Sequence, residues 1–414
     1  MAHLLLLEAP GGNDFDILQA ALAVGHEVTF FTADLAHYQR NGSLEAYLSR
    51  ARAVIEIQPF SYAAFEKSAA AIHGETPFDG ILCLIDIRII EAAALAERLG
   101  LRFLNPQTAT LLRDKYRVRC ALAERGIAQP DFALATHNGE LRNAVSDLGL
   151  PVIVKPCDGY GSQNITMLLT DDDINPLIDP LDHYLPCRTD YGLGVTANDR
   201  LLVERYIEGT LIGCDTLTLD GKHVMLGINE KSMFPPPFGA IQGSCFPSDR
   251  FDVAPVREYV FAVLDAVGFN DGASHTEIIL SAEGPLLVEV NPRLVGAKIP
   301  RLLNLAFGRS VHRDLIDLHL GIPPSAAAYR KPDGYAVSRW IVAERAGTLA
   351  DIRLPQTPDR RIKQVEILKT PGDAVTPPYQ NSDRIGCVMA LAETRAQAEQ
   401  CANAYVSQVE LAVI

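Results

Sequence analysis

Two acidic residues twelve positions apart are the side chains best suited to chemistry in this sequence. Glu277 and Glu289 belong to two β-like runs, 275–280 and 286–291, joined by the five-residue connection 281–285. Runs of this kind predict a β-hairpin. A connection that is symmetric about its middle residue places Glu277 opposite Glu289 on the neighbouring strand.

The same register sorts the other hairpin residues onto two faces. It pairs Leu280 with Leu286 and His275 with Asn291. Because side chains alternate along a strand, His275 and Asn291 share a face with the two glutamates. The opposite face is almost wholly apolar and should pack on the core, and its members are Thr276, Ile278, Leu280, Leu286, Val288 and Val290.

Two carboxylates directly opposite each other destabilise a sheet, since their Cβ atoms lie about 5 Å apart. One glutamate could take up a proton, as carboxylate pairs do. Alternatively, hard divalent cations lie between the side chains, and Asn291 completes the all-oxygen ligand set that Mg²⁺ prefers. A solvated face with the side chains splayed apart is the third interpretation. The neighbouring Asn291 and Arg293 favour the metal.

A magnesium site with few protein ligands normally shares its metal with phosphate oxygens, so the chain should also contain a phosphate-binding segment. Lys155 ends the apolar run 152–154, where an ammonium group needs an anionic partner. The loop 158–162 follows, and its glycines let backbone N–H groups approach an anion. A second apolar run, 165–169, makes this unit a hairpin. Taken alone, the loop is as typical of an ordinary turn.

Two further segments could help to hold a nucleotide. Lys115 follows Asp114, which suits a helix cap, and it adds a second cation if the domains close that way. A solvated helix lysine is the alternative. Glu204 opens the segment 204–207, which offers a carboxylate and backbone groups to an adenine edge, although a surface ion pair would explain the same residues.

Taken in order along the chain, these segments resemble the ATP-grasp superfamily, and within it the carboxylate–amine ligases of the L-amino acid (dipeptide) ligase type. The resemblance spans nearly the whole chain and rests on the motifs RDKYRVR (113–119), VIVKP (152–156), VERYIEG (203–209), HTE (275–277) and EVNPR (289–293). It implies a mixed α/β and α+β protein with the ATP-grasp fold. Such a protein has a Rossmann-like N-terminal (pre-ATP-grasp) domain, a lid subdomain and a C-terminal α+β region.

The resemblance also implies a role for each candidate residue. ATP would be held by Lys115, Lys155, Gly159, Gly161, Ser162, Glu204, Tyr206 and Ile207. Two Mg²⁺ ions, for which Mn²⁺ can substitute, would be bound by Glu277, Glu289 and Asn291. Substrates would contact Lys231, Ser244, His275 and Arg293. The catalytic candidates are Arg293, which would contact the activated carboxylate, and Lys155.

The chain departs from this family in two places. Such enzymes often carry a ribose-binding glutamate where this chain has Leu211. Related dipeptide ligases carry a Gly-His pair where this chain has Gly243 and Ser244. The resemblance therefore does not identify the residue that contacts the ribose or one of the residues that contact the substrates. The segment between Lys231 and Ser244, with Phe234, Phe238 and Gln242, should line the substrate pocket or form a surface flap.

The implied reaction is ATP-dependent amide formation through an acyl phosphate, joining an amino acid or small carboxylic acid to an amine or amino acid. The amine could instead belong to a polyamine, to a substrate held on a carrier protein, or to a siderophore or antibiotic precursor in secondary metabolite biosynthesis. Two other function classes remain. One is a dehydrogenase on the N-terminal sheet, although GxGxxG is absent. The other is a non-catalytic ATP-binding protein of the same fold.

The composition argues against some classes of binding partner. The 37 basic and 51 acidic residues give a net charge of −14, which leaves little of the phosphate-neutralising attraction that drives nucleic-acid binding. There is no apolar run long enough for a membrane helix and no basic start of a secretory signal. The eight cysteines form no CxxC pair, as expected of a cytoplasmic protein. Small-molecule substrates are the expected partners, and a homodimer is an open option.

The elements that position these residues follow from apolar patterning. The 414 residues predict two to four domains, and we place four. They are an N-terminal α/β domain (1–106), a central domain with the ATP lid hairpin (107–205), a catalytic core (206–325) and a C-terminal α+β subdomain (326–414).

Within the first domain, short apolar runs alternate with helix-like stretches, which is typical of a mostly parallel sheet. The strands are expected at 3–7, 27–31, 80–85 and 101–104, and Asn105 should cap the helix that follows. Near the other end of the chain, Thr394 and Gln397 have the spacing of a capping box at the start of the last helix.

Overall fold

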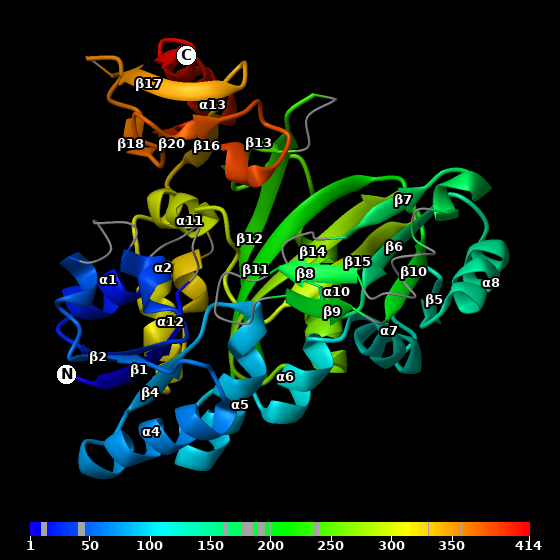
Figure 1. Cartoon of the computed structure of the whole chain (residues 1–414), viewed down its shortest axis with the longest axis horizontal. Coiled ribbons are helices and arrows are strands. Elements are labelled where there is room, and N and C mark those ends of the chain that lie inside the picture. Colours follow the sequence, from blue (N-terminus) through cyan, green and yellow to red (C-terminus); the bar gives the residue numbers. More distant parts are fainter. Residues whose placement is uncertain are drawn as a thin grey trace.

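A computed structural model describes residues 1–9, 15–39, 46–159, 164–175, 177, 185–188, 195–198, 200–235, 240–329, 331–356 and 358–414. Figure 1 shows the chain as an N-terminal α/β unit, a small lid unit and a long twisted sheet that continues into the C-terminal part. Among the described residues, no helix has both the length and the apolar character needed to cross a bilayer.

The N-terminal unit is a parallel sheet covered by helices. Its strand order is β3-β2-β1-β4, and all five residues of β1 are buried, as expected of a parallel strand covered on both faces. The elements are β1 (His3–Leu7), α1 (Asp16–Ala23), β2 (Glu27–Thr32), α2 (Leu35–Gln39), β3 (Ala53–Glu56), α4 (Tyr62–Glu75), β4 (Gly80–Leu82), the 3-10 turn η1 (Asp86–Arg88) and α5 (Ile89–Leu99).

Two of the predicted strands in this unit need correction. The segment 101–104 is not a strand, and its residues Phe103 and Leu104 are buried because they pack under the neighbouring helices. Only the first half of the predicted strand 80–85 pairs with β1. The predicted strands at 3–7 and 27–31 are confirmed.

The helices that follow begin where the capping residues predict. Asn105 accepts a hydrogen bond from Thr108 N (2.7 Å) at the start of α6 (Pro106–Leu112), and Asp114 accepts one from Arg117 N (3.1 Å) at the start of α7 (Lys115–Glu124). Lys115 is thereby fixed at the first turn of α7.

The lid unit is a four-stranded antiparallel sheet with its own apolar core. Its order is β5-β10-β6-β7, and α8 packs on it. The predicted hairpin around Lys155 is confirmed, since β6 and β7 pair antiparallel. The elements are β5 (Phe132–Ala135), α8 (Asn138–Leu148), β6 (Val152–Pro156), β7 (Thr166–Leu168), the 3-10 turn η2 (Asp171–Ile174), the pair β8 (Leu185–Arg188) and β9 (Val195–Asn198), and β10 (Leu201–Arg205).

An eight-stranded sheet joins the central and C-terminal parts. Its order is β15-β14-β11-β12-β13-β16-β20-β18. The strands are β11 (Thr210–Leu219), β12 (Lys222–Met233), β13 (Ile241–Phe246), β14 (Gly272–Ser281), β15 (Gly284–Asn291), β16 (Tyr335–Ile341), β18 (Ile362–Ile367) and β20 (Gly386–Ala392). One face of β11 and β14 carries buried Ile212, Cys214 and Ile278, which belong to the same core as helix α10 (Val253–Ala266).

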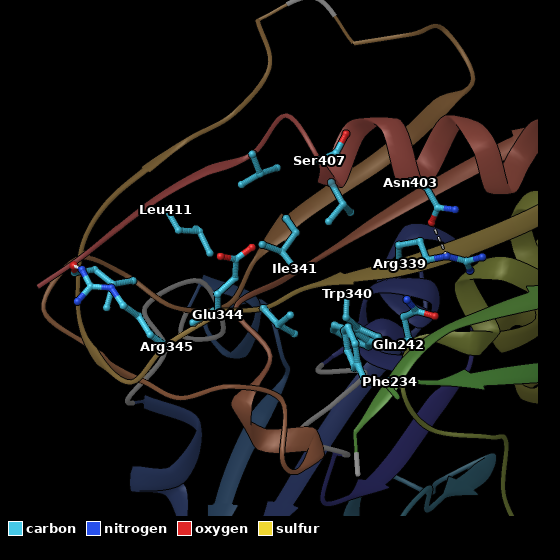
Figure 2. A pocket seen from close by; sticks show the side chains of 15 residues that line it. Phe234, Gln242, Arg339, Trp340, Ile341, Glu344, Arg345, Asn403, Ser407 and Leu411 are labelled. Carbon is cyan, nitrogen blue, oxygen red and sulfur yellow. Dashed lines mark hydrogen bonds between the residues drawn. The ribbon is translucent and has the colours of Figure 1, made fainter. Parts of the chain in front are cut away.

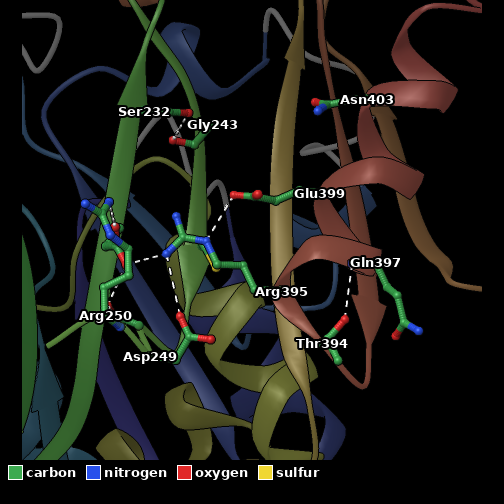
Figure 3. Close-up of polar contacts among 12 residues, drawn as sticks. Ser232, Gly243, Asp249, Arg250, Thr394, Arg395, Gln397, Glu399 and Asn403 are labelled. Atoms are coloured by element: carbon green, nitrogen blue, oxygen red, sulfur yellow. Dashed lines mark hydrogen bonds and ion pairs between the residues drawn. The ribbon is translucent and has the colours of Figure 1, made fainter.

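The C-terminal part covers the far end of this sheet. Helix α13 (Arg395–Val406) packs on β16 and β20, and its cap Thr394 accepts from Gln397 N (3.3 Å), as predicted. Arg395 joins α13 to β12 through Glu230 (2.6 Å), beside Asp249 and Glu399 (Figure 3). The remaining elements are α11 (Ile299–Phe307), α12 (Val311–His319), β17 (Gly347–Arg353), β19 (Ala374–Val375), β21 (Glu410–Val413) and the 3-10 turns η3 (Ala326–Tyr329) and η4 (Asn381–Asp383).

Candidate active site

The predicted hairpin is present, and it pairs the two glutamates. β14 and β15 run antiparallel, with Glu277 opposite Glu289 and His275 opposite Asn291. Both predicted pairs are confirmed. Because cross-strand partners point to the same side of a sheet, the four side chains share the face opposite the apolar core.

The turn of this hairpin differs from the prediction. Ser281 pairs with Gly284, so the connection has two residues rather than five, and the predicted Leu280–Leu286 pair is wrong because Leu280 faces Pro285. A β-bulge restores the register, since the ladder shifts by one residue on β15 between the Ile278–Leu287 pair and the glutamate pair. The tighter turn and the extra residue cancel, and the two glutamates still meet.

The bulge also corrects the predicted apolar face. Leu287 is buried with 1% of its surface exposed, whereas Val288, predicted to lie in the core, is only half-buried. A bulged strand re-aims its backbone locally. Here the Val288 carbonyl accepts hydrogen bonds from Lys155 Nζ and Arg119 Nη2, each at 3.2 Å. The bulge therefore connects the glutamate hairpin to the lysine of the lid unit.

Each glutamate of the pair contacts a lysine. Lys231 Nζ lies 2.5 Å from Glu277 Oε1, and Lys115 Nζ lies 3.5 Å from Glu289 Oε2. Burial raises the pKa of Glu277, but Lys231 and His275 outweigh burial and hold that pKa well below its usual range. Glu277 is therefore a carboxylate, and a proton on this residue is not what relieves the repulsion between the pair.

The oxygen donors at this place fit a hard divalent cation. Two carboxylates and the Asn291 amide form an all-oxygen set of the kind that Mg²⁺ prefers, and Asn291 Nδ2 donates to Glu289 Oε1 (2.9 Å). Within the described ranges there is no group of three or more histidine, cysteine or acidic side chains able to hold a metal. Protein ligands are few, so other oxygens would have to complete the coordination shell.

Lys155 belongs to a buried charged cluster. Its ammonium lies 2.6 Å from Glu204 Oε2, and Arg119 Nε lies 2.5 Å from Glu204 Oε1. Lys155 and Glu204 are 4% and 5% exposed, so the alternative of a surface ion pair at Glu204 is wrong. Burial raises the pKa of Glu204, but Arg119 and Lys155 outweigh burial and lower it. Burial lowers the pKa of Lys155, because Glu204 only partly compensates for lost hydration.

The segment 204–207, which is predicted to contact adenine, offers fewer free polar groups than expected. Both carboxylate oxygens of Glu204 are engaged by Lys155 and Arg119. Tyr206 N donates to Pro151 O (3.0 Å), while the Tyr206 side chain is 41% exposed. The backbone of Ile207 and the Tyr206 carbonyl are what this segment leaves for a ligand.

Lys115 lies at the start of the glycine-containing loop. Its ammonium donates to Gly159 O (2.6 Å) and its backbone N–H donates to Cys157 O (2.8 Å). Together with its contact to Glu289, this brings Lys115 between the loop and the hairpin. Gly161 and Ser162 fall outside the described residues.

Arg293, two residues after Asn291, is held by the N-terminal unit. Its Nε and Nη2 lie 2.8 Å and 2.6 Å from Asp86 Oδ2, and Nη1 donates to Leu294 O (3.0 Å). Burial lowers the pKa of Arg293, but Asp86 outweighs burial and raises it. Burial likewise raises the pKa of Asp86, and Arg293, Arg113 and Lys115 outweigh burial and lower it. Asp86 is therefore a buried carboxylate at the domain junction.

His275 lies between two carboxylates. Its Nδ1 is 3.4 Å from Asp215 Oδ1 and its Nε2 is 3.5 Å from Glu277 Oε1. Burial lowers the pKa of His275, but Asp215 and Glu277 outweigh burial and raise it. Gly213 makes this packing fit, because a Cβ there would lie 2.7 Å from both Asn229 Oδ1 and His275 Cε1.

Three domain families match consecutive parts of the chain. Residues 18–102 match the ATP-grasp N-terminal domain, residues 148–300 the ATP-grasp domain, and residues 339–413 the L-amino acid ligase C-terminal domain 2. The chain belongs to the ATP-grasp superfamily, in its L-amino acid ligase branch. The predicted family and fold are thereby confirmed.

Two proteins of known sequence and one solved structure are similar to this ATP-grasp protein. It is 28% identical over 321 residues to an uncharacterized protein, y4rH, of Sinorhizobium fredii, covering 75% of this chain and 63% of that protein. It is 27% identical over 307 residues to an L-arginine-specific L-amino acid ligase of Bacillus subtilis, covering 72% and 71%. The crystal structure of an L-amino acid ligase from Bacillus licheniformis shares the fold, with a TM-score of 0.80, 19% identity, and coverage of 100% of this chain and 99% of that one.

The two departures from the family have clear locations in this ATP-grasp site. Leu211 lies opposite Ile279 and is 43% exposed, so this chain has an apolar side chain at the position where such enzymes often carry a ribose-binding glutamate. Ser244 pairs with Lys231 on the neighbouring strand and is 3% exposed, and its N–H donates to Ser338 Oγ (3.0 Å). Lys231 and Ser244 thus point to the same side of the sheet as Glu277.

Sequence reasoning missed three charged residues of the ATP-grasp site. They are Arg119, Asp86 and Asp215. A sequence signal existed for Arg119, which is the last residue of the motif RDKYRVR. A weaker one existed for Asp86, an acid directly after the apolar run 80–85. Asp215 sits inside an apolar strand and is 1% exposed, a position where an acid normally needs partners.

Proposed function

We propose that this protein is an ATP-dependent ligase that joins the carboxylate of an amino acid or small acid to an amine through an acyl phosphate. The observation that carries the proposal is the convergence of Lys115 and Lys155 on the glutamate hairpin, through contacts with Glu289 and Val288, beside Arg293, which follows Asn291 in the chain. These cations come from three different parts of the chain.

In this proposal Glu277, Glu289 and Asn291 hold two Mg²⁺ ions, for which Mn²⁺ can substitute. The support is the all-oxygen donor set and the ionised state of Glu277. Bound divalent ions supply charge neutralisation on the transferring phosphoryl group. Lys231, which neutralises Glu277 in the structure, is then free to turn toward a substrate on the same side of the sheet.

ATP would lie between the lid unit and the hairpin. Lys115 and Lys155 would neutralise its phosphates, and the loop that begins at Gly159 and contains Gly161 and Ser162 would close over them. The backbone of Tyr206 and Ile207 would meet the adenine edge. Glu204 acts in this proposal by fixing Lys155, because its two oxygens are already bound to cations.

The first chemical step is attack of a substrate carboxylate oxygen on the γ-phosphorus of ATP, which breaks the bond to the β-phosphate oxygen and releases ADP. Arg293 would hold this carboxylate. The step turns an unreactive anion into an acyl phosphate. Excluding water by closure of the lid protects this intermediate from hydrolysis.

The second step is attack of a neutral amine on the acyl carbon. The carbonyl oxygen gains negative charge, which Arg293 and His275 would stabilise. Collapse expels phosphate, which carries away one oxygen of the original carboxylate, and the amine loses a proton to give the amide. Lys231 and Ser244 would contact the substrates beside this centre.

The substrate class is supported by the L-arginine-specific L-amino acid ligase of Bacillus subtilis, whose name states an amino acid substrate. We infer that at least one substrate here is an amino acid. A carrier-bound amine, or a siderophore or antibiotic precursor, is the alternative acceptor. A cytoplasmic location and a homodimer stay predictions.

A product screen tests the proposal. Purified protein is incubated with ATP, Mg²⁺ and pairs of amino acids, amines and small acids, while ADP is measured and product masses are recorded. We expect ADP in step with a mass equal to the sum of both substrates less water. ATP binding without ADP from any pair, even with hydroxylamine present to trap acyl phosphate, would instead indicate a non-catalytic ATP-binding protein.

A further inference from the structure

The loop that carries Arg293 has a strained backbone at its far end. This loop, 292–298, links β15 to α11, and we call it the arginine loop. Ala297 and Lys298 both have a left-handed backbone, with φ of 56° and 64°. Glycine, asparagine and aspartate adopt this conformation readily, whereas in other L-residues Cβ comes too close to the following carbonyl oxygen. Two such residues in succession need neighbours that hold them in place.

The side chain of Lys298 makes a contact that can hold this backbone. It is 1% exposed, and its ammonium lies 2.6 Å from Glu366 Oε1 on β18, in the C-terminal part. A buried ammonium is costly unless it is paired with an acid. The ion pair therefore fixes where the Lys298 side chain lies and, with it, the end of the arginine loop.

Two earlier residues of the arginine loop are held by other parts of the chain. Arg293 is bound by Asp86 of the N-terminal unit (2.6 Å), and Val295 N donates to Asp215 Oδ1 on β11 (3.0 Å). With Lys298, these contacts recur every two or three residues along the loop. Because each comes from a different part of the fold, the course of the loop depends on all three.

Glu366 also contacts the helix that follows the loop. Arg301, on α11, lies against Glu366 Oε2 and donates two hydrogen bonds to Asp16 of α1, at 2.7 Å and 2.8 Å. Figure 1 shows α11 between the N-terminal unit and the C-terminal strands. Asp16 and Glu366 thus share Arg301 as a partner, but of the two acids Glu366 is the one that reaches Lys298.

Glu366 belongs to a sheet that is supported from its other side. β18 pairs with β20 and β20 with β16, which places Glu366 in register with Cys387 and Trp340. Since side chains alternate along a strand, Arg339 points to the opposite face of this sheet. There it donates to Asn403 Oδ1 of α13 (2.8 Å; Figure 2). Glu366 is therefore a fixed point against which the arginine loop can be held.

We propose that Glu366 is a positioning residue for Arg293, because by pairing with Lys298 it holds the arginine loop in its left-handed course. The C-terminal part then contributes to carboxylate activation without touching the reactants. This inference rests on the proposed function, which gives Arg293 its role in the reaction. The alternative is an ion pair that stabilises the fold and nothing more.

Two variants remove the ion pair from either end. Lys298→Met replaces the buried ammonium by an apolar chain of similar length, and Glu366 keeps Arg301 as a partner, so that no buried charge is left alone. Glu366→Gln removes the charge at the other end. One control is Asp16→Asn, which takes an acid from Arg301 and leaves Lys298 paired. The other is Ala297→Gly, which eases the left-handed backbone and changes no ion pair.

Two measurements compare these variants. Acyl phosphate formation is trapped as the hydroxamate, with a substrate from the product screen, and hydrogen exchange is followed in the peptide that covers 292–298. We expect K298M and E366Q to lower kcat about tenfold or more, to change KM for ATP less than about twofold, and to speed exchange in this peptide. D16N and A297G should keep the wild-type kcat and the wild-type exchange.

An ion pair that acts on folding alone predicts a different pattern, which would overturn the proposal. Wild-type kcat in K298M would do so, and so would an equal loss of kcat in E366Q and D16N, since both remove one acid from Arg301. The exchange measurement needs no turnover and keeps the two claims apart. If no substrate pair yields ADP in the wild type, the proposed function fails, whereas unchanged exchange in K298M and E366Q removes the positioning role of Glu366.

Discussion

Asp86 holds Arg293 through a single carboxylate oxygen, with Nε at 2.8 Å and Nη2 at 2.6 Å from Oδ2. The two residues are 207 positions apart. One follows the last strand of the N-terminal sheet, and the other follows the glutamate hairpin. The contact therefore lets the N-terminal unit set the orientation of the arginine that we propose contacts the reacting carboxylate.

Asp86→Asn should separate orientation from charge at this contact. The amide keeps the shape of the side chain but carries no negative charge to pair with Arg293. We therefore expect kcat for ADP formation to fall about 10- to 100-fold, with little change in KM for ATP. Glu91→Gln is the matched control, because Glu91 contacts Arg88 in the same region and does not touch Arg293. Wild-type kcat in D86N would show that Arg293 needs no help from the N-terminal unit.

Glu289→Gln tests the proposed metal ligands. Replacing one of two carboxylates removes a charged oxygen ligand, so we expect Mg²⁺-dependent ADP formation to fall at least 100-fold while the circular dichroism spectrum and the melting temperature stay close to those of the wild type. Glu283→Gln is the control, since Glu283 is exposed at the turn of the same hairpin. Full activity of E289Q would remove the metal assignment.

Arg119→Met tests the buried charged cluster. The variant leaves Glu204 with one cation, removes the Arg119 donor to the Leu287 carbonyl and leaves Lys155 as the side-chain donor to the Val288 carbonyl. Losing one partner of a buried ion pair typically costs about 3–5 kcal/mol. We expect a decrease of that order in the free energy of unfolding measured with urea.

Arg117→Met is the control for this experiment, because Arg117 is exposed on the same helix. R117M should change the free energy of unfolding by less than about 0.5 kcal/mol. Equal stability of R119M and R117M would mean that the cluster contributes nothing to folding.

Stability should fall as the pH is lowered below 6.5, because two buried histidines resist protonation. Burial lowers the pKa of both His312 and His319 to about 4. Between pH 6.5 and 4 the unfolded chain binds more protons at these residues than the folded protein, so stability decreases with falling pH, by at most about 1.4 kcal/mol per pH unit for each histidine.

His319→Phe should make this decrease less steep. Phe103, on which His319 stacks at 5.2 Å, provides the comparison, since Phe103→Leu should lower stability by a similar amount at every pH. Urea unfolding from pH 4.5 to 7.5 measures both. An unchanged pH slope in H319F would show that His319 is not one of the groups responsible.

Sequence patterning predicted the pairing of the two glutamates and most of the apolar face of their hairpin, because alternation of apolar residues is a local property. It could not predict the two-residue turn at Ala282 and Glu283, because that turn and the bulge near Val288 compensate each other and leave the pattern unchanged. The segment 101–104 has the apolar pattern of a strand for a related reason. Its apolar residues are buried by helices, and composition does not distinguish the two environments.

The missed residues of the site make contacts with residues that are far away in the sequence. Arg119 meets Glu204 across 85 positions, and Arg293 meets Asp86 across 207. A single sequence gives no measure of how the lid unit and the N-terminal unit approach the hairpin. The predicted lysines were found because each lies in a local segment with a readable pattern, whereas Asp86 and Asp215 meet Arg293 and His275 only in the folded protein.

The central claim is that a substrate carboxylate, and not a preformed ester, is activated by ATP in this site. The most direct measurement uses an amino acid that the product screen identifies as a substrate, with both carboxylate oxygens labelled with ¹⁸O. The released phosphate is then analysed by mass spectrometry. We predict one ¹⁸O atom in each phosphate formed together with the amide. Phosphate that carries no substrate oxygen would contradict the acyl phosphate and the proposed function.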